Sequence, residues 1–120
     1  MAEQPNILVI LSDQHGAPWS SPYGHPIIQS PNLDRLAAQG TVFDNAYCNS
    51  PICVPSRMSF VSGQHVHHNG TWDNGVPLPS DVPTWAHLAK SAGYDVVLSG
   101  KMHFRGLDQL HGFRKQLAYD

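Results

Sequence analysis

One stretch decides the fold class: the sequence NILVILS at residues 6–12. It is a continuous run of β-branched and leucine residues, bounded by Pro5 and by the polar segment that begins at Asp13. Such a run is typical of a parallel strand that is buried on both faces. The carboxyl end of this strand would deliver Asp13 and Gln14 to the edge of a sheet, where open α/β sheets place their ligands.

Two helices are expected in the middle of the chain. Residues 30–40 combine a serine N-cap, a proline at the first helical position, apolar spacing and a terminal glycine, which predicts a short amphipathic helix. Residues 41–47 can form a short strand. A second helix is expected from Pro55 to Gly63, with Cys53 just before its first turn.

A third helix and a last strand complete the expected order of elements. The helix covers residues 84–92, with Trp85, Leu88 and Ala89 on one packed face. The strand covers residues 94–98. Strands and helices in this order predict an α/β fold with a mostly parallel sheet flanked by helices.

Composition restricts both the size and the partners of the protein. With 120 residues, 41% hydrophobic and 13% charged, the chain is expected to form one folding unit around a loop-rich core. The net charge is −2 and no basic run occurs, which argues against nucleic-acid binding. The N-terminus lacks a basic region and its apolar run is too short to span a membrane, which predicts a cytoplasmic protein. The expected apolar strands must be packed on both faces, and the expected helices are too few to do so. The chain is therefore expected to be a fragment of a larger domain.

The segment CVPSR at residues 53–57 carries the strongest chemical signal. A cysteine at a helix N-terminus meets unpaired backbone N–H groups and the positive end of the helix dipole. Arg57 adds a fixed cation one turn on, so the position suits a bound oxyanion. For a cysteine and an arginine alone, the commoner reading is a small buried hydrophobic residue that precedes a helix.

Cys53-Val54-Pro55-Ser56-Arg57, followed by Ser62-Gly63, resembles the hallmark of the sulfatases of the alkaline phosphatase superfamily. The resemblance implies the N-terminal part of an alkaline-phosphatase-like sandwich. It also implies that a formylglycine-generating or sulfatase-maturing enzyme converts Cys53 to formylglycine, whose hydrated aldehyde is the nucleophile. One hydroxyl would attack sulfur, and loss of the second proton would then expel sulfate by restoring the aldehyde. Arg57 would hold the modified side chain and the sulfate oxygens.

A second family signature lies at Gly93-Tyr94 and in the sequence SGKMH at residues 99–103. By resemblance, Lys101 supplies a compact charge for sulfate oxygens, and His103 donates a hydrogen bond to formylglycine or sulfate. Both residues would therefore be catalytic and would also bind the substrate. Taken alone, they would be read as a solvated lysine and a surface histidine.

A third signature is Asp13-Gln14, which follows the first expected strand. Sulfatases place such a pair there to bind one divalent cation, usually calcium, together with the formylglycine, here at Cys53, and a later pair of ligands. Oxygen ligands of this kind suit a hard cation. An isolated Asp-Gln pair would be merely a turn.

The resemblance covers essentially the whole chain, which we expect to be an incomplete N-terminal part of a sulfatase catalytic domain. Residues 99–104 and 106–113 look most like choline-sulfatase and its relatives. The expected activity is hydrolysis of a small sulfate monoester such as choline sulfate. Two alternatives stay open: a phosphonate monoester or phosphodiester hydrolase of the same superfamily, and an inactive fragment with unmodified Cys53. Sulfatases are several times longer, so the 120 residues alone are not expected to turn over substrate, and homo-oligomerisation of a longer form stays open.

The histidines give a weaker signal. Residues 64–82 are turn-rich and expected on the surface, and they contain His65, His67 and His68. A zinc site is not favoured there, because no Cys-x-x-Cys pair or His-x-x-x-His helix face sets a tetrahedron. Sulfatases often border the pocket with such a segment, so His65 and His68 are candidates for substrate binding. Cys48 is expected to be an inert buried thiol.

Overall fold

The computed structural model describes residues 4–118. Residues 1–46 and 47–120 form two compact units rather than the one folding unit that the length suggested. The apolar residues of the buried core all lie in the second unit. Among the described residues, no helix is long and apolar enough to cross a membrane.

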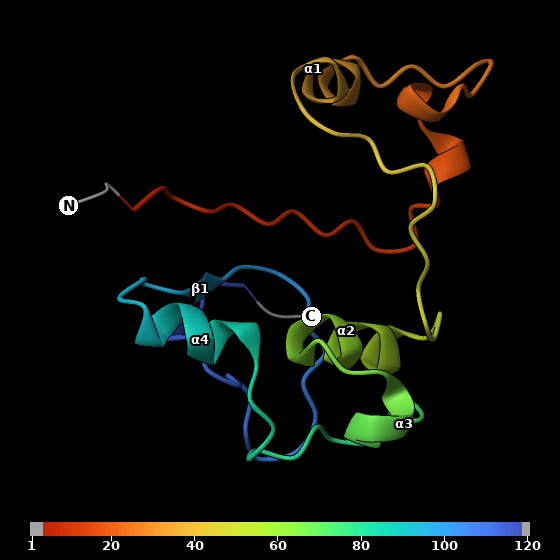
Figure 1. Cartoon of the computed structure of the whole chain (residues 1–120). Helices are drawn as coiled ribbons and strands as arrows, with labels where there is room; N and C mark the ends of the chain where they lie inside the picture. The colour runs from red at the N-terminus through yellow and green to blue at the C-terminus, as the bar shows by residue number, and fades with distance from the viewer. Residues whose placement is uncertain (1–3, 119–120) are drawn as a thin grey trace. The chain divides into compact units, whose positions relative to one another are not determined.

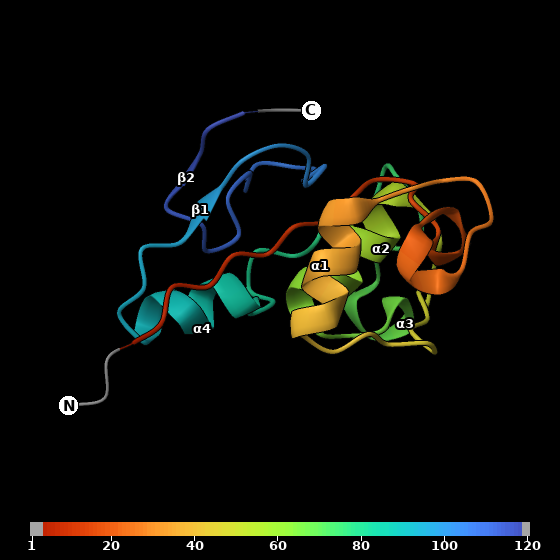
Figure 2. The ribbon, with the colours of Figure 1, turned by 90° about the horizontal axis from the view of Figure 1, so that it is seen from above.

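The elements are distributed over the two units as follows (Figures 1 and 2). The first unit contains the 3-10 helices η1 (Ala17–Trp19) and η2 (Ser21–Tyr23) and the helix α1 (Pro31–Gln39). The second contains the helices α2 (Cys53–Ser62), α3 (Val66–Asn69) and α4 (Trp85–Ser91) and the strands β1 (Val97–Leu98) and β2 (Lys115–Gln116).

Helix α1 confirms the first predicted helix, although its N-cap works differently from expectation. Ser30 occupies the N-cap position, but its side chain does not cap the helix. Its hydroxyl lies 2.6 Å from the hydroxyl of Ser21, which also donates to Asp34 Oδ1 at 2.8 Å in the first turn of α1. The serine pair therefore fixes η2 against the start of α1.

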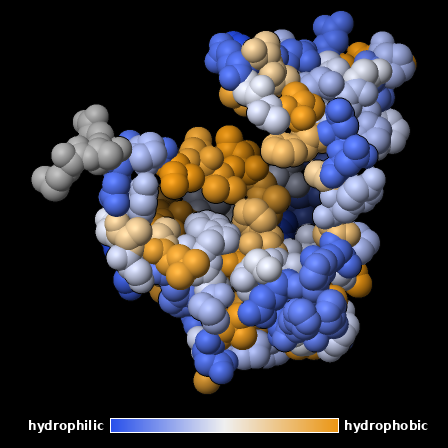
Figure 3. All heavy atoms as spheres, in the orientation of Figure 1, coloured by the Kyte–Doolittle hydropathy of each residue, from blue (hydrophilic) through white to orange (hydrophobic). Residues whose placement is uncertain are grey.

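The predicted strands at residues 6–12 and 41–47 are both wrong for the described part of the chain. A strand exists through hydrogen bonds to a neighbour, and neither segment forms such a ladder within residues 4–118. The apolar side chains of the first segment are exposed, with Leu8 83% accessible. Figure 3 shows this apolar surface along the segment that Figure 1 colours red. Residues 4–118 therefore do not supply the cover that such a run requires.

The second unit is built around the contacts of α2 with α3 and α4. Its buried apolar residues are Val54, Met58, Val61, Leu78, Ala86, Met102, Phe104 and Phe113. Strands β1 and β2 pair in parallel, with Val97 opposite Lys115 and Leu98 opposite Gln116. The parallel pairing agrees with the predicted α/β class, and the strand expected over residues 94–98 shortens to β1.

Helices α2 and α4 confirm two of the predicted helices, but details of each differ from the prediction. Cys53 is the first residue of α2 rather than the residue before it. Thr84 caps α4, because its side chain accepts from the N–H of His87 and its own N–H donates to His87 Nδ1. The packed face of α4 was predicted only in part: Trp85 packs against the core, but Ala86 is fully buried and Leu88 is 68% exposed.

Residues 64–82 lie less on the surface than predicted. Asn69, Thr71 and Leu78 are all buried. The side-chain oxygen of Asn69 accepts both the N–H and the hydroxyl of Thr71, at 3.0 and 2.6 Å. Burial removes these polar groups from water, and the local hydrogen bonds replace the bonds to water that they lose.

The junction between α4 and the segment before β2 is tightly packed. The fully buried His111 accepts the Thr84 hydroxyl on its carbonyl oxygen at 2.7 Å. Burial lowers the pKa of His111, against the opposing charge of Asp108 3.5 Å from its Nδ1. The next residue, Gly112, has a φ of 97°, and a Cβ there would lie 2.7 Å from His87 N. No side chain fits at this position without moving α4.

We predict that Gly112→Ala destabilises the protein more than Gly93→Ala. Both glycines have a positive φ, of 97° and 90°, but no heavy atom lies within 4 Å of a Cβ at Gly93. Backbone strain of roughly 1–2 kcal/mol is common to both variants, and only Gly112→Ala adds a clash with His87. Urea denaturation measures the difference in the free energy of unfolding. Equal losses in the two variants would contradict the packing at His87.

Candidate functional site

The first turn of α2 begins at Cys53, and two of its backbone positions have no N–H free for a ligand. Pro55 has no N–H, and the N–H of Val54 donates to Asn74 Oδ1 at 2.9 Å. Ile52 occupies the N-cap but has no side-chain acceptor, so Asn74 replaces the missing cap from twenty residues away. Of the first three residues of α2, only Cys53 therefore has a backbone N–H that the bond to Asn74 does not occupy.

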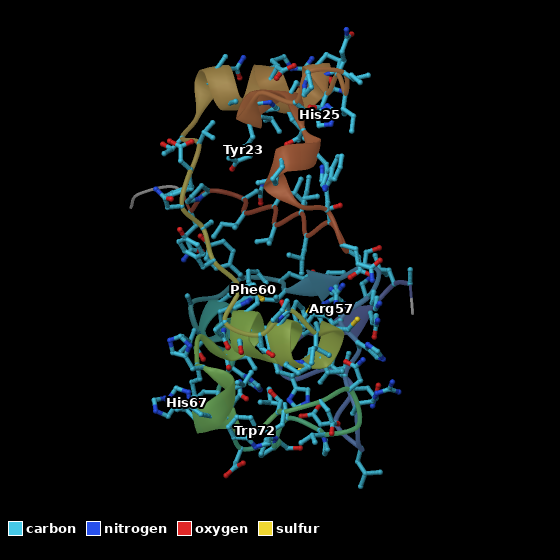
Figure 4. All side chains as sticks on the ribbon, turned by 90° about the vertical axis from the view of Figure 1, so that its right-hand side faces the viewer. Tyr23, His25, Arg57, Phe60, His67 and Trp72 are labelled. Atoms are coloured by element: carbon cyan, nitrogen blue, oxygen red, sulfur yellow. The ribbon has the colours of Figure 1, made fainter. Side chains whose placement is uncertain are left out.

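Lys101 lies beside the thiol of Cys53. Its Nζ is 4.0 Å from Cys53 Sγ, although the two residues are 48 positions apart in the sequence. Arg57, 5% exposed on α2 (Figure 4), donates from Nη1 to the carbonyl oxygen of Lys101 at 2.8 Å. A helix N-terminus and an ammonium group thus surround one atom, and together they favour negative charge there.

The segment that follows β1 alternates between core and site. Met102 and Phe104 are buried in the core, whereas Lys101 and His103 are half-buried. The two apolar side chains hold the segment against the core. Lys101 and His103 therefore point away from the core, although this segment is not a regular strand.

His103 has an unusual backbone conformation and a charged neighbour. Its φ is 58°, a left-handed conformation that non-glycine residues seldom adopt and that clusters at functional sites. Its Nε2 lies 2.5 Å from Arg105 Nη2. Arg105 Nε in turn donates to the carbonyl oxygen of Asn74 at 2.9 Å. The residue that caps α2 therefore also fixes the arginine that contacts His103.

Asp13 and Gln14, the expected cation ligands, belong to the first unit, whereas Cys53 belongs to the second. Gln14 has a φ of 56°, so Asp13 is followed at once by a left-handed turn. Carboxylate and amide oxygens fit a hard cation in kind, but calcium takes about six to eight oxygens. Within residues 4–118, no group of three or more His, Cys, Asp or Glu side chains could hold a metal. The donor chemistry fits, and further ligands are required.

The remaining candidates are more peripheral. His65 and His68 are exposed, and their rings contact His67 with centroids 5.5 and 4.1 Å apart. Cys48 is exposed, so its prediction as a buried thiol is wrong. Cys48 lies in the irregular segment before α2. Its Sγ donates a hydrogen bond to the carbonyl oxygen of Ser50 at 3.1 Å.

Two residues of the site were not found from the sequence: Asn74 and Arg105. Asn74 lies in the turn Asp73-Asn74-Gly75, which reads only as a loop. Arg105 is two residues beyond His103, and this proximity is the one signal that could have indicated it.

Comparison with known proteins identifies the class of enzyme to which this site belongs. The family model described as Sulfatase matches residues 5–119. A choline-sulfatase of Rhizobium meliloti is 43% identical over 98% of this chain and 23% of its own length. An N-acetylglucosamine-6-O-sulfatase of Bacteroides thetaiotaomicron is 38% identical over 84% of this chain and 18% of its own length.

Solved structures agree with this assignment. One, in complex with its substrate D-glucosamine-2-N,6-O-disulfate, has a TM-score of 0.88 and 36% identity over 95% of this chain and 23% of that chain. The chain belongs to the sulfatase family. It spans about a fifth to a quarter of the length of the two curated relatives.

We predict that Asn74→Ala destabilises the protein by about 1 kcal/mol, the usual cost of losing a helix cap. Val54 N–H would lose its acceptor, and α2 would fray at Cys53. Denaturant unfolding measures the loss, and protection of the amide protons of α2 from exchange locates it. Asn32→Ala, at an exposed position of α1, is the matched control and should leave α2 unchanged. If the two variants behaved alike, Asn74 would not be the cap.

Proposed function

We propose that the protein containing this chain hydrolyses a sulfate monoester, with a nucleophile derived from Cys53. One observation carries the proposal: Lys101 Nζ lies 4.0 Å from Cys53 Sγ at the N-terminus of α2. Family membership supplies the reaction class. The site supplies what that class requires, which is positive charge around the atom that meets the sulfuryl group.

Cys53 would act in a modified form. We propose that a separate maturation enzyme, with its own oxidant, converts the thiol-bearing carbon to the aldehyde of formylglycine. The Sγ position then stands for the oxygen attached to that carbon. In its hydrated form the group would supply an oxygen nucleophile.

The other residues would hold and neutralise the sulfate. Lys101 would offset charge on the sulfuryl oxygens, and His103 would donate a hydrogen bond to formylglycine or sulfate. Arg57 would keep Lys101 in place through its carbonyl oxygen. We retain His65 as a candidate that borders the substrate pocket.

We further propose that Asp13 and Gln14, with the modified residue at position 53, contribute to a site for one divalent cation, calcium by its preference for oxygen ligands. Such an ion supplies positive charge beside the sulfuryl oxygens. Its remaining ligands would come from residues outside this chain.

Choline sulfate is the substrate that we favour, because the choline-sulfatase relative shares 43% identity over 98% of the chain. The second relative is named for a sulfated sugar, so the alcohol part of the substrate differs among the relatives. A phosphonate monoester or phosphodiester substrate remains the alternative. A cytoplasmic location, without nucleic-acid or membrane partners, remains a prediction from composition.

We predict that Cys53, but not Cys48, is converted to formylglycine in cells that contain a maturation enzyme. Position 53 would lose one sulfur and two hydrogens and gain one oxygen. Peptide mass spectrometry with fragmentation measures both cysteines at once, because the peptide between Arg35 and Arg57 contains both. Cys48 is the internal control. An intact thiol at Cys53 would favour the inactive alternative.

In the complete gene product, we predict that Lys101→Ala lowers kcat for choline sulfate by about 10²–10³-fold, the usual effect of removing one group that stabilises developing charge. Lys115→Ala, which removes an exposed lysine of β2, is the matched control and should retain activity.

Assays of the complete gene product with an aryl sulfate and an aryl phosphodiester distinguish the two substrate classes. Faster turnover of the phosphodiester would overturn the proposed sulfate monoester activity.

A further inference from the structure

Arg105 is an exposed residue whose guanidinium group is nevertheless fixed at two points. Its Nε donates to the carbonyl oxygen of Asn74 at 2.9 Å, and its Nη2 lies 2.5 Å from Nε2 of His103. A guanidinium group is planar, so one hydrogen bond at Nε orients the nitrogen that meets His103. Neither contact is needed for the hydrophobic core.

The chemistry of the pair determines the form of the imidazole ring. Arginine stays protonated and has only donors, so a hydrogen bond between Arg105 Nη2 and His103 Nε2 requires Nε2 to accept. A ring that accepts at Nε2 is neutral and carries its proton on Nδ1. His103 Nδ1 is a buried atom, so the donor nitrogen is the one on the inner side of the ring.

We propose that Arg105 is a positioning residue that holds His103 as the neutral tautomer with its proton on Nδ1. The inference rests on the proposed function for the role of His103 in the reaction. In that role His103 would donate a hydrogen bond from Nδ1 to formylglycine or sulfate. Histidine free in solution favours the other neutral tautomer, with the proton on Nε2. The arginine is therefore required to select the form that donates inward.

The backbone connects this selection to the nucleophile. Asn74 offers its carbonyl oxygen to Arg105 and its side-chain oxygen to the N–H of Val54, the residue after Cys53. One turn thus fixes both the start of α2 and the group that orients His103. The left-handed backbone of His103, at a φ of 58°, places its ring against Arg105 rather than along a regular strand.

The test is a two-bond ¹H–¹⁵N correlation spectrum of protein labelled with ¹⁵N-histidine, recorded at about pH 8, where histidine is ordinarily neutral. The two ring nitrogens give different shifts and cross-peak patterns in the two tautomers. His103→Gln assigns the signals by removing one set. We expect wild-type His103 to carry its proton on Nδ1, and Arg105→Met to move it mainly to Nε2.

Arg114→Met is the matched control. Arg114 is exposed and forms an ion pair with Asp95, so this variant makes the same chemical change away from His103 and should leave its tautomer as in wild type. A wild-type His103 with its proton on Nε2 overturns the proposal without any variant. Retention of the Nδ1 proton in Arg105→Met, with an otherwise unchanged amide spectrum, also overturns it. The spectrum requires no turnover, so an unmodified Cys53 would contradict the proposed function and leave this result standing.

Discussion

The hydrogen bond from Arg57 Nη1 to the carbonyl oxygen of Lys101 is the constraint on which the site depends. Arg57 lies one helical turn after Cys53 and is almost fully buried, so its guanidinium group must find protein partners. The bond at 2.8 Å brings the segment after β1 to the start of α2. This bond acts together with the burial of Met102 and Phe104, which turns the side chain of Lys101 away from the core, so that its ammonium group lies beside the thiol.

Helices α1, α2 and α4 could be predicted from the sequence because their signals are local, whereas the short helix α3 lies in a segment that was predicted as turns. Caps, proline at the first position and terminal glycine all lie within a few residues of the helix that they define. The strands were predicted less well, since a strand needs a partner, and of those expected only the one over residues 94–98 is present in the described part of the chain, shortened to β1. The apolar run at residues 6–12 has the composition of a buried strand but no ladder within residues 4–118. The polar pair Lys115–Gln116 has no strand pattern at all, yet it forms β2 because it meets β1.

The candidate site divides in the same way. Cys53 and Arg57 were predicted from their place at a helix start together with a motif that resembles the sulfatase hallmark, and Lys101 and His103 from a second such motif. Asn74 and Arg105 contribute through a backbone carbonyl and through contacts between distant segments, which no local pattern encodes. The left-handed backbone at Gln14 and His103 was not predicted either, because non-glycine residues seldom adopt a positive φ and no local pattern marks these two positions.

The two cations near Cys53 therefore have different physical roles. Arg57 is buried and donates to a main-chain oxygen, so part of its hydrogen-bonding capacity maintains the geometry. Lys101 is half-buried, and its ammonium group lies 4.0 Å from Sγ, where in the proposed mechanism it would offset charge that develops on the sulfuryl oxygens. Coulombic attraction falls with distance, and the 4.0 Å contact would let Lys101 act directly on charge at position 53. This argues that loss of Lys101 should act mainly on kcat, whereas loss of Arg57 should act on folding and catalysis together.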